Sequence, residues 1–167
     1  GVRVLERGAW FVSAAQVRGR VSFEGREELL ERIVHPAPGA APEQAEPPAP
    51  LAEPDTTVPL SRLAWTRSGD KGNACNVGVI ARKPEYLPYI AAAMSEAAVA
   101  EHYAYLLRDG GGSVKRWYLP GCNGLNFLLG GALDGGCTVS LRFDAMGKSA
   151  SQDALDMPIP VPGALLA

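Results

Sequence analysis

Hydrophobic and polar residues alternate along several short stretches of the chain, and a period of two is typical of β-strands. Residues 60–66 and 138–143 alternate in this way, whereas residues 17–23 and 114–119 are rich in β-branched and aromatic side chains. Residues 75–81 form a nearly continuous apolar stretch, which indicates a more deeply buried strand. We therefore predict strands over these five stretches.

Two further segments are predicted to be extended. Residues 9–13 combine aromatic and β-branched side chains. Residues 157–162 contain three prolines, which lack the amide donor that an inner strand needs, so we expect this tail at a sheet edge.

Helical spacing of apolar residues appears elsewhere. Residues 26–33 read as a short amphipathic helix, and residues 83–94 carry apolar side chains at helical spacing after an early Pro84. A second helix is predicted over residues 96–107 and a short one over residues 125–129. Few strands together with segregated helices favour an α+β sandwich.

Proline marks the domain organisation. Eight of the fourteen prolines lie between Pro36 and Pro59, so neither a helix nor a central strand is expected there. We predict a linker over residues 35–57 and a folded domain over residues 58–167, although a long surface loop has the same composition. Residues 1–34 are too few to close a core, so we expect them to pack on that domain, on another subunit or on an absent body. Because the chain begins without methionine, we expect either a processed chain or a piece cut from a longer one.

Composition narrows the function classes. With 47% hydrophobic residues and a net charge of -2, the chain can form a core and lacks the basic character of nucleic-acid binders. The absence of an apolar run of about 20 residues argues against a membrane span. The chain has three widely spaced cysteines, Cys75, Cys122 and Cys137, which are too few and too scattered for a disulfide framework or a metal site. We expect all three to be buried or half-buried thiols, and a reducing cytoplasm is the simplest compartment for them. No cofactor is expected.

The densest polar cluster is the segment between the strands predicted over residues 60–66 and 75–81. It reads Arg67-Ser68-Gly69-Asp70-Lys71-Gly72-Asn73. Glycines allow backbone amides to approach a ligand, and an arginine fork with a lysine charge suits a carboxylate or phosphate. The alternative is a polar hairpin in which Asp70, Lys71 and Gly72 simply make the turn.

Two other clusters offer polar groups between glycines. In residues 120–127, Asn123 and Asn126 are able to bind a ligand carbonyl or to cap the short predicted helix. In residues 144–148, Asp144 and Lys148 belong to a ligand site or to an ordinary turn. His102 is interpreted as a packed or surface helical residue.

These clusters together resemble the C-terminal domain of the acyclic terpene utilisation AtuA family. The resemblance covers residues 58–162 and rests on four blocks: 67–73, 76–82, 126–136 and 144–148. It implies a ferredoxin-like α+β fold with a mixed or antiparallel sheet and helices on one face, normally attached to a larger N-terminal α/β body. Residues 1–34, which the residue pattern predicts to be a small β-rich segment, are a candidate remnant of that body. The family is associated with the breakdown of branched acyclic terpenoids such as citronellol and geraniol, alongside acyl-CoA enzymes.

The resemblance also implies a site. Arg67 and Lys71 would hold an oxyanion, and Asp70 and Ser68, with Lys71, would carry the catalytic proton chemistry. The remaining ligand contacts are expected from Gly69, Gly72, Asn73, Asn126 and Lys148. The expected partners are a small acidic or CoA-linked substrate and a larger AtuA-type body in the same or another chain, in an oligomer without nucleic acid or membrane. The alternative hypothesis is a non-catalytic module that docks that body.

Overall fold

The computed structural model describes residues 12–13, 16–30, 44–107 and 112–167. The chain divides into two compact units, Gly1–Pro42 and Glu43–Ala167, which are described separately. Among the described residues, no helix is long and apolar enough to cross a membrane, and no group of three or more acidic, histidine or cysteine side chains could hold a metal ion.

The first unit contains a β-hairpin of strands β1 (Arg20–Phe23) and β2 (Arg26–Leu29), whose residues are all exposed. The predicted helix over residues 26–33 is therefore wrong where the structure describes it. Glu24 and Gly25 both have positive φ, 47° and 76°, which is the geometry of a tight hairpin turn, and this turn directs residues 26–29 back along β1. Of the strand predicted over residues 9–13, residues 9–11 lie outside the described residues, and residues 12–13 are described and form no strand.

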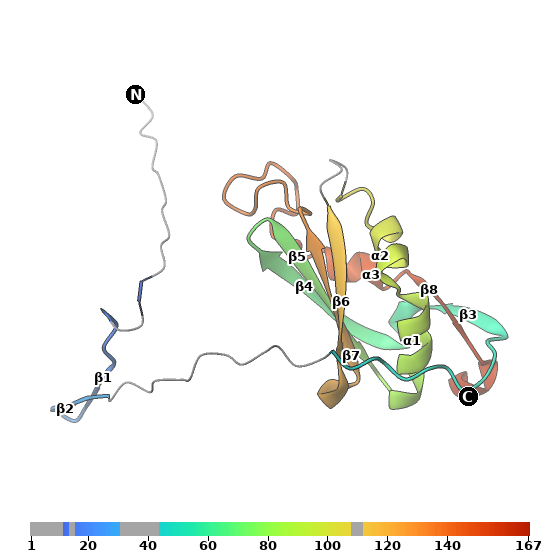
Figure 1. Ribbon diagram of the computed structural model, residues 1–167, viewed down its shortest axis with the longest axis horizontal. Coiled ribbons are helices and arrows are strands. Elements are labelled where there is room, and N and C mark those ends of the chain that lie inside the picture. Colours follow the sequence, from blue (N-terminus) through green and yellow to red (C-terminus); the bar gives the residue numbers. More distant parts are fainter. Residues whose placement is uncertain (1–11, 14–15, 31–43, 108–111) are drawn as a thin grey trace. The chain divides into compact units, whose positions relative to one another are not determined.

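The second unit is built on a four-stranded antiparallel sheet in the order β4-β5-β7-β6 (Figure 1). Its strands are β4 (Ala64–Lys71), β5 (Ala74–Ala81), β6 (Ser113–Leu119) and β7 (Gly124–Gly130). A two-stranded antiparallel pair, β3 (Thr56–Pro59) with β8 (Pro158–Val161), confirms the extended proline-rich tail. Strands β5 and β6 also match the predicted stretches.

The helices are short and lie on one side of the sheet, together with the β3–β8 pair (Figure 1). They are α1 (Leu87–Ala93), α2 (Glu96–His102) and α3 (Ala150–Ala154), with 3-10 turns at Leu60–Arg62, Pro84–Tyr86, Pro120–Cys122 and Gly163–Leu166. Ser95 caps α2 by accepting a hydrogen bond from the Ala98 amide. This α+β arrangement confirms the predicted fold class.

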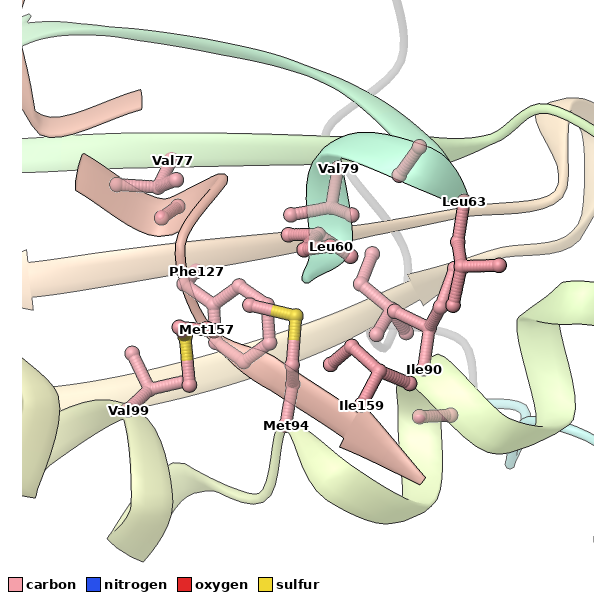
Figure 2. Packing of buried hydrophobic residues seen from close by; sticks show 14 of the residues in the cluster. Leu60, Leu63, Val77, Val79, Ile90, Met94, Val99, Phe127, Met157 and Ile159 are labelled. Carbon is pink, nitrogen blue, oxygen red and sulfur yellow. The ribbon is translucent and has the colours of Figure 1, made fainter. Parts of the chain in front are cut away.

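The core lies between the sheet and this layer. Figure 2 shows Val77, Val79 and Phe127 of the sheet packed among Met94 of the α1–α2 connection and Ile159 of β8. All five side chains are almost completely buried. Because side chains on a strand alternate between faces, burial of every second residue on β5 and β7 identifies the covered face and leaves the other face open.

Three sequence predictions in this unit need correction. Residues 125–129 belong to strand β7 rather than to a helix, because they pair with β5 on one side and β6 on the other. Residues 138–143 form no strand, since no other described strand pairs with them. The strand predicted over residues 60–66 begins only at Ala64, because Leu60–Arg62 form a 3-10 turn.

Candidate functional site

The segment predicted as a loop over residues 67–73 is an edge strand followed by a tight turn. Strand β4 continues to Lys71, where Lys71 pairs with Ala74 of β5. Only Gly72 and Asn73 make the turn. The loop prediction was wrong because β4 pairs with β5 along its whole length, in spite of the glycines and charges that usually mark loops.

The strand alternation divides the segment between two faces. Arg67, Gly69 and Lys71 lie on the open face of the sheet. Ser68 and Asp70 lie on the covered face, opposite Val77 and Cys75 of β5. The structure therefore places Ser68 and Asp70 on the opposite face of the sheet from Lys71, the third residue expected to take part in proton chemistry.

Ser68 is a structural residue in this arrangement. Its hydroxyl donates to the Lys148 carbonyl oxygen at 3.1 Å and accepts from the Ser151 amide at 2.9 Å. The residue is only 5% exposed. These bonds hold the start of α3 against β4 and occupy the hydroxyl.

Asn73 also has a structural role. Its side-chain oxygen accepts a hydrogen bond from the Gly135 amide at 2.7 Å, and its carbonyl oxygen accepts one from the Leu133 amide at 3.1 Å. Asn73 therefore holds the turn after β7 against the β4–β5 turn. Gly72, which has a φ of 67°, belongs to the latter turn and lies at the end of the open face.

The open face is defined here by the outward residues of the four strands. In order from β4 across β5 and β7 to β6, these are Trp65, Arg67, Gly69, Lys71, Ala74, Asn76, Gly78, Ile80, Gly124, Asn126, Leu128, Gly130, Ser113, Lys115, Trp117 and Leu119. Three of them are cations and none carries a carboxylate. In a chain with a net charge of -2, this is a local segregation of positive charge.

A chain of hydrogen bonds crosses three strands of this face. The Lys71 ammonium donates to the Asn76 side-chain oxygen at 3.0 Å, and the Asn76 amide nitrogen donates to the Asn126 side-chain oxygen at 3.2 Å. Because an ammonium group has only donors, it fixes the orientation of both amides. The chain therefore ends in the Asn126 amide nitrogen, which is another donor.

Lys148 adds a fourth cation from outside the sheet. Its carbonyl oxygen is held by Ser68 on the covered side of β4, whereas its ammonium nitrogen lies 2.9 Å from the position that a Cβ at Gly69 would occupy. Lys148 therefore reaches round the edge of the sheet, and the missing side chain at Gly69 leaves the space for its ammonium group. The structure thus brings Arg67, Lys71 and Lys148 to one edge of the open face.

Apolar side chains lie at the end of the face remote from Lys71. Trp65, Ile80 and Leu119 are 55%, 43% and 42% exposed, and they flank Gly124 in one cross-strand row. The Arg82 guanidinium stacks on the Trp65 ring at 4.7 Å from its centroid. The face therefore combines an exposed aromatic and aliphatic end with a cationic end.

Sequence reasoning missed Asn76, Lys115 and Trp117 as members of this face. The signal was the alternation itself, which places every second residue of a strand on one face. It could not be used across the sheet because residues 125–129, the strand that joins β5 to β6, resemble a helix in sequence.

The turn at residues 144–148 is ordered by Asp144. Its carboxylate accepts hydrogen bonds from the amides of Lys148 and Ser149, at 2.8 and 2.7 Å, and from the Ser149 hydroxyl at 2.6 Å. Partial burial raises the pKa of this carboxyl, but the hydrogen bonds from Ser149, Lys148 and Gly147 outweigh it, so that the pKa lies below its usual value. The turn interpretation of Asp144 agrees with this geometry, and the same turn positions Lys148.

The remaining polar residues and the cysteines singled out in the sequence lie outside the open face of the sheet. Asn123 ends a 3-10 turn with a φ of 50°, and the His102 imidazole lies 3.4 Å from the Asp153 carboxylate on the helical side. Cys75 is buried, and burial raises the pKa of its thiol, whereas Cys122 and Cys137 are exposed. The expectation of three buried or half-buried thiols is therefore wrong for two of them.

Comparison with known proteins agrees with the resemblance. The model of the AtuA ferredoxin-like domain matches residues 58–160, which is more than half of the chain. A search of the curated proteins gave no match, and a search of the solved structures gave none either. The matched region contains the four-stranded sheet, its helical layer and the three cations at the edge of the open face, Arg67, Lys71 and Lys148. The chain belongs to the AtuA ferredoxin-like domain family, as the sequence blocks predicted.

Proposed function

We propose that the open face of the sheet binds a ligand carrying carboxylate or phosphate oxygens. The protein would do so as part of an AtuA-like system that breaks down branched acyclic terpenoids or acyl-CoA derivatives. The observation that carries this proposal is the set of donors on this face: Arg67, Lys71 and Lys148 at one edge and the Asn126 amide on the inner strand β7. No carboxylate is among the outward residues of the sheet.

The donors have complementary geometries. A guanidinium binds two oxygens of a carboxylate or phosphate in one plane, whereas the two ammonium groups act as point charges that tolerate several orientations. Arg67 and Lys148 form no hydrogen bond or ion pair through their charged groups with the residues described, so those groups are available to a ligand.

Glycines shape the ligand surface. Arg67 and Asn126 flank Gly78 in one cross-strand row, so the sheet backbone is accessible between them. Gly69 similarly leaves room for the ammonium group of Lys148. An oxyanion resting over Gly78 would have donors on both sides.

The proposed division of roles differs from the expectation based on sequence. Lys71 remains a candidate for polarising or protonating the ligand, because its ammonium group is exposed on the binding face. Ser68 and Asp70 would act through the fold, since they lie on the covered face. Additional catalytic groups would then come from a larger AtuA-type body.

Binding of acyl-CoA measured by titration calorimetry tests this proposal. We expect the double variant Arg67→Ala/Lys71→Ala to weaken binding at least tenfold, because it removes two charge-assisted contacts worth about 1.5–3 kcal/mol each. Arg62→Ala is the matched control, since Arg62 is an exposed cation in the 3-10 turn before β4. Affinity of the wild type should also fall with added salt.

The proposal fails if the wild-type chain shows no binding. It also fails if Arg62→Ala weakens binding as much as the double variant, because the effect would then come from net charge. Circular dichroism of each variant verifies that the sheet is retained.

The second candidate function is docking of a larger AtuA-type body. It is favoured by the exposed row of Trp65, Ile80 and Leu119 on the same face. A small oxyanion would not cover this apolar area, whereas the surface of a partner protein would. Mass measurement after co-expression with such a body tests it. We expect a complex whose affinity is lowered by Trp65→Ala. If the mass of the chain stays that of a monomer in the presence of the body, this function is excluded.

A further inference from the structure

An exposed apolar strip comes after the last strand of the sheet in the sequence. It consists of Val139, Leu141 and Phe143, which alternate with Thr138, Ser140 and Arg142 along the chain. Val139 is 65% exposed, Leu141 is 99% exposed and Phe143 is completely exposed. Apolar side chains of this size are rarely presented in a row to solvent unless they meet a partner.

Hydrogen bonds and an ion pair hold the segment that carries the strip against the rest of the domain. The Arg142 guanidinium donates to the Leu106 carbonyl oxygen at 3.3 Å and lies 4.0 Å from the Asp134 carboxylate. The Ser140 amide donates to the Gly136 carbonyl oxygen at 2.9 Å. The Val139 amide donates to the same carbonyl oxygen at 3.1 Å. The backbone of the strip is therefore held against the domain, while the side chains of Val139, Leu141 and Phe143 remain exposed.

A cavity of about 380 Å³ adjoins the strip. It is lined by Tyr105, Leu106, Leu133, Gly147 and Ala150, and by the chain at residues 142–144. Phe143 of the same chain borders the cavity but does not fill it, since its side chain is completely exposed. The lining is mostly apolar, with Arg142, Asp144 and Ser149 as its polar members. An apolar plug and a mostly apolar socket therefore lie next to each other on one surface.

We propose that this surface is a two-fold interface between two copies of the chain, in which Phe143 and Leu141 of each copy enter the cavity of the other. A two-fold contact uses the same patch on both partners, so a plug adjacent to its socket satisfies both copies at once. The proposal does not rest on the oxyanion site, which lies on the open face of the sheet, although the turn that positions Lys148 also borders the cavity.

The area is sufficient for a weak dimer. Phe143 alone can bury about 150–250 Å², and Val139, Leu141 and Met146, which is 49% exposed, extend the patch. Counted on both copies together with the cavity walls, the contact lies near the lower end of specific interfaces, about 1,200 Å² in total. A dissociation constant of about 1–100 µM is therefore expected.

Sedimentation velocity of the full chain across this concentration range tests the interface. The wild type should shift from monomer to dimer, and Phe143→Asp or Leu141→Asp should raise the dissociation constant at least tenfold, since a charge would have to enter the cavity. Thr138→Asp is the control at an exposed polar position of the same segment. Leu51→Asp is the control for apolar exposure elsewhere, because Leu51 is 97% exposed.

Disulfide trapping tests the plug and socket directly, in chains whose exposed cysteines Cys122 and Cys137 are replaced by serine. A chain with Phe143→Cys should form a mixed disulfide with a chain carrying Tyr105→Cys, but not with one carrying Leu51→Cys. The proposal is overturned by a wild type that stays monomeric at the highest concentration. It is equally overturned by a dimer that survives both aspartates, or by one that Leu51→Asp abolishes as well.

Discussion

At the scale of single residues, neighbours in the signature segment have different tasks because the strand alternation separates them. Arg67 and Lys71 carry charge on the open face, and Ser68 holds α3 on the covered face. Asn73 holds the following turn. A sequence block that looks like one polar site is thus partly a binding surface and partly a set of structural contacts.

Gly147 shows how tightly the turn that carries Lys148 is packed. Its φ is 61°, and a Cβ at this position would overlap the Cys75 sulfur and lie 3.3 Å from a methyl group of Leu133. We expect Gly147→Ala to lower the free energy of unfolding by about 2–4 kcal/mol, from backbone strain together with overpacking. Urea unfolding followed by circular dichroism measures this change.

Gly121→Ala is the matched control for Gly147→Ala. Apart from the two neighbouring residues in the chain, no atom lies within 4 Å of a Cβ built at Gly121, and the φ of Gly121 is not in the left-handed region. This control should change stability by no more than about 0.5 kcal/mol. Equal effects of the two alanines would contradict the packing described for Gly147.

At the scale of elements, the turn at residues 144–148 links the charge state of one carboxylate to the position of a cation. Asp144 binds the amides of Lys148 and Ser149, and Lys148 in turn reaches the open face over Gly69. Because the charged carboxylate accepts these bonds, the turn is stabilised only while Asp144 is ionised.

This linkage predicts a pH dependence. The pKa of Asp144 in the folded chain is lowered from 3.8, so its contribution to stability is complete above that pH and is lost as the pH falls through the folded value. We expect thermal melts of the wild type to lose stability below about pH 4, and Asp144→Asn to lose less over the same interval. Ser149→Ala should give an intermediate profile, because it removes one of the hydrogen bonds to the carboxylate. An identical slope for wild type and Asp144→Asn would contradict this role.

Helices and strands were predictable from the sequence where the local propensity of the residues and their pairing in the folded domain favour the same secondary structure. Residues 75–81 and 114–119 carry strong strand formers, and both are strands. Residues 125–129 and 138–143 were misassigned, although each contains regularly spaced apolar residues. In the first case two neighbouring strands supply the hydrogen bonds of a strand, and in the second case no described strand does.

At the scale of the whole molecule, the two units differ in how they are stabilised. The unit of residues 43–167 contains a continuous core of buried side chains between the sheet and its helical layer. The described hairpin of the other unit is exposed along both strands, and an isolated two-stranded hairpin is at best marginally stable. The cooperative unfolding of the chain should therefore belong to residues 43–167.

Deletion of residues 1–42 tests this assignment. We expect the shortened chain to melt within about 3 °C of the full chain, because every buried core residue among those described lies between Val58 and Val161. Differential scanning calorimetry measures the midpoint and the enthalpy. A fall of the midpoint by more than this, or a halved enthalpy, would show that residues 1–42 are part of the cooperative structure.

The sequence by itself determined the α+β class, the family and the presence of Arg67, Lys71, Asn126 and Lys148 in its signature blocks. These features depend on local periodicity and on residue identity, which are readable along the chain. Only the tertiary structure decided that the polar segment is an edge strand, that Ser68 and Asp70 lie on the covered face, and that Lys148 reaches round to join Arg67. The physical reason is that strand pairing is non-local: the register between β4, β5 and β7 sets which side chains share a face, and no short stretch of sequence contains that register.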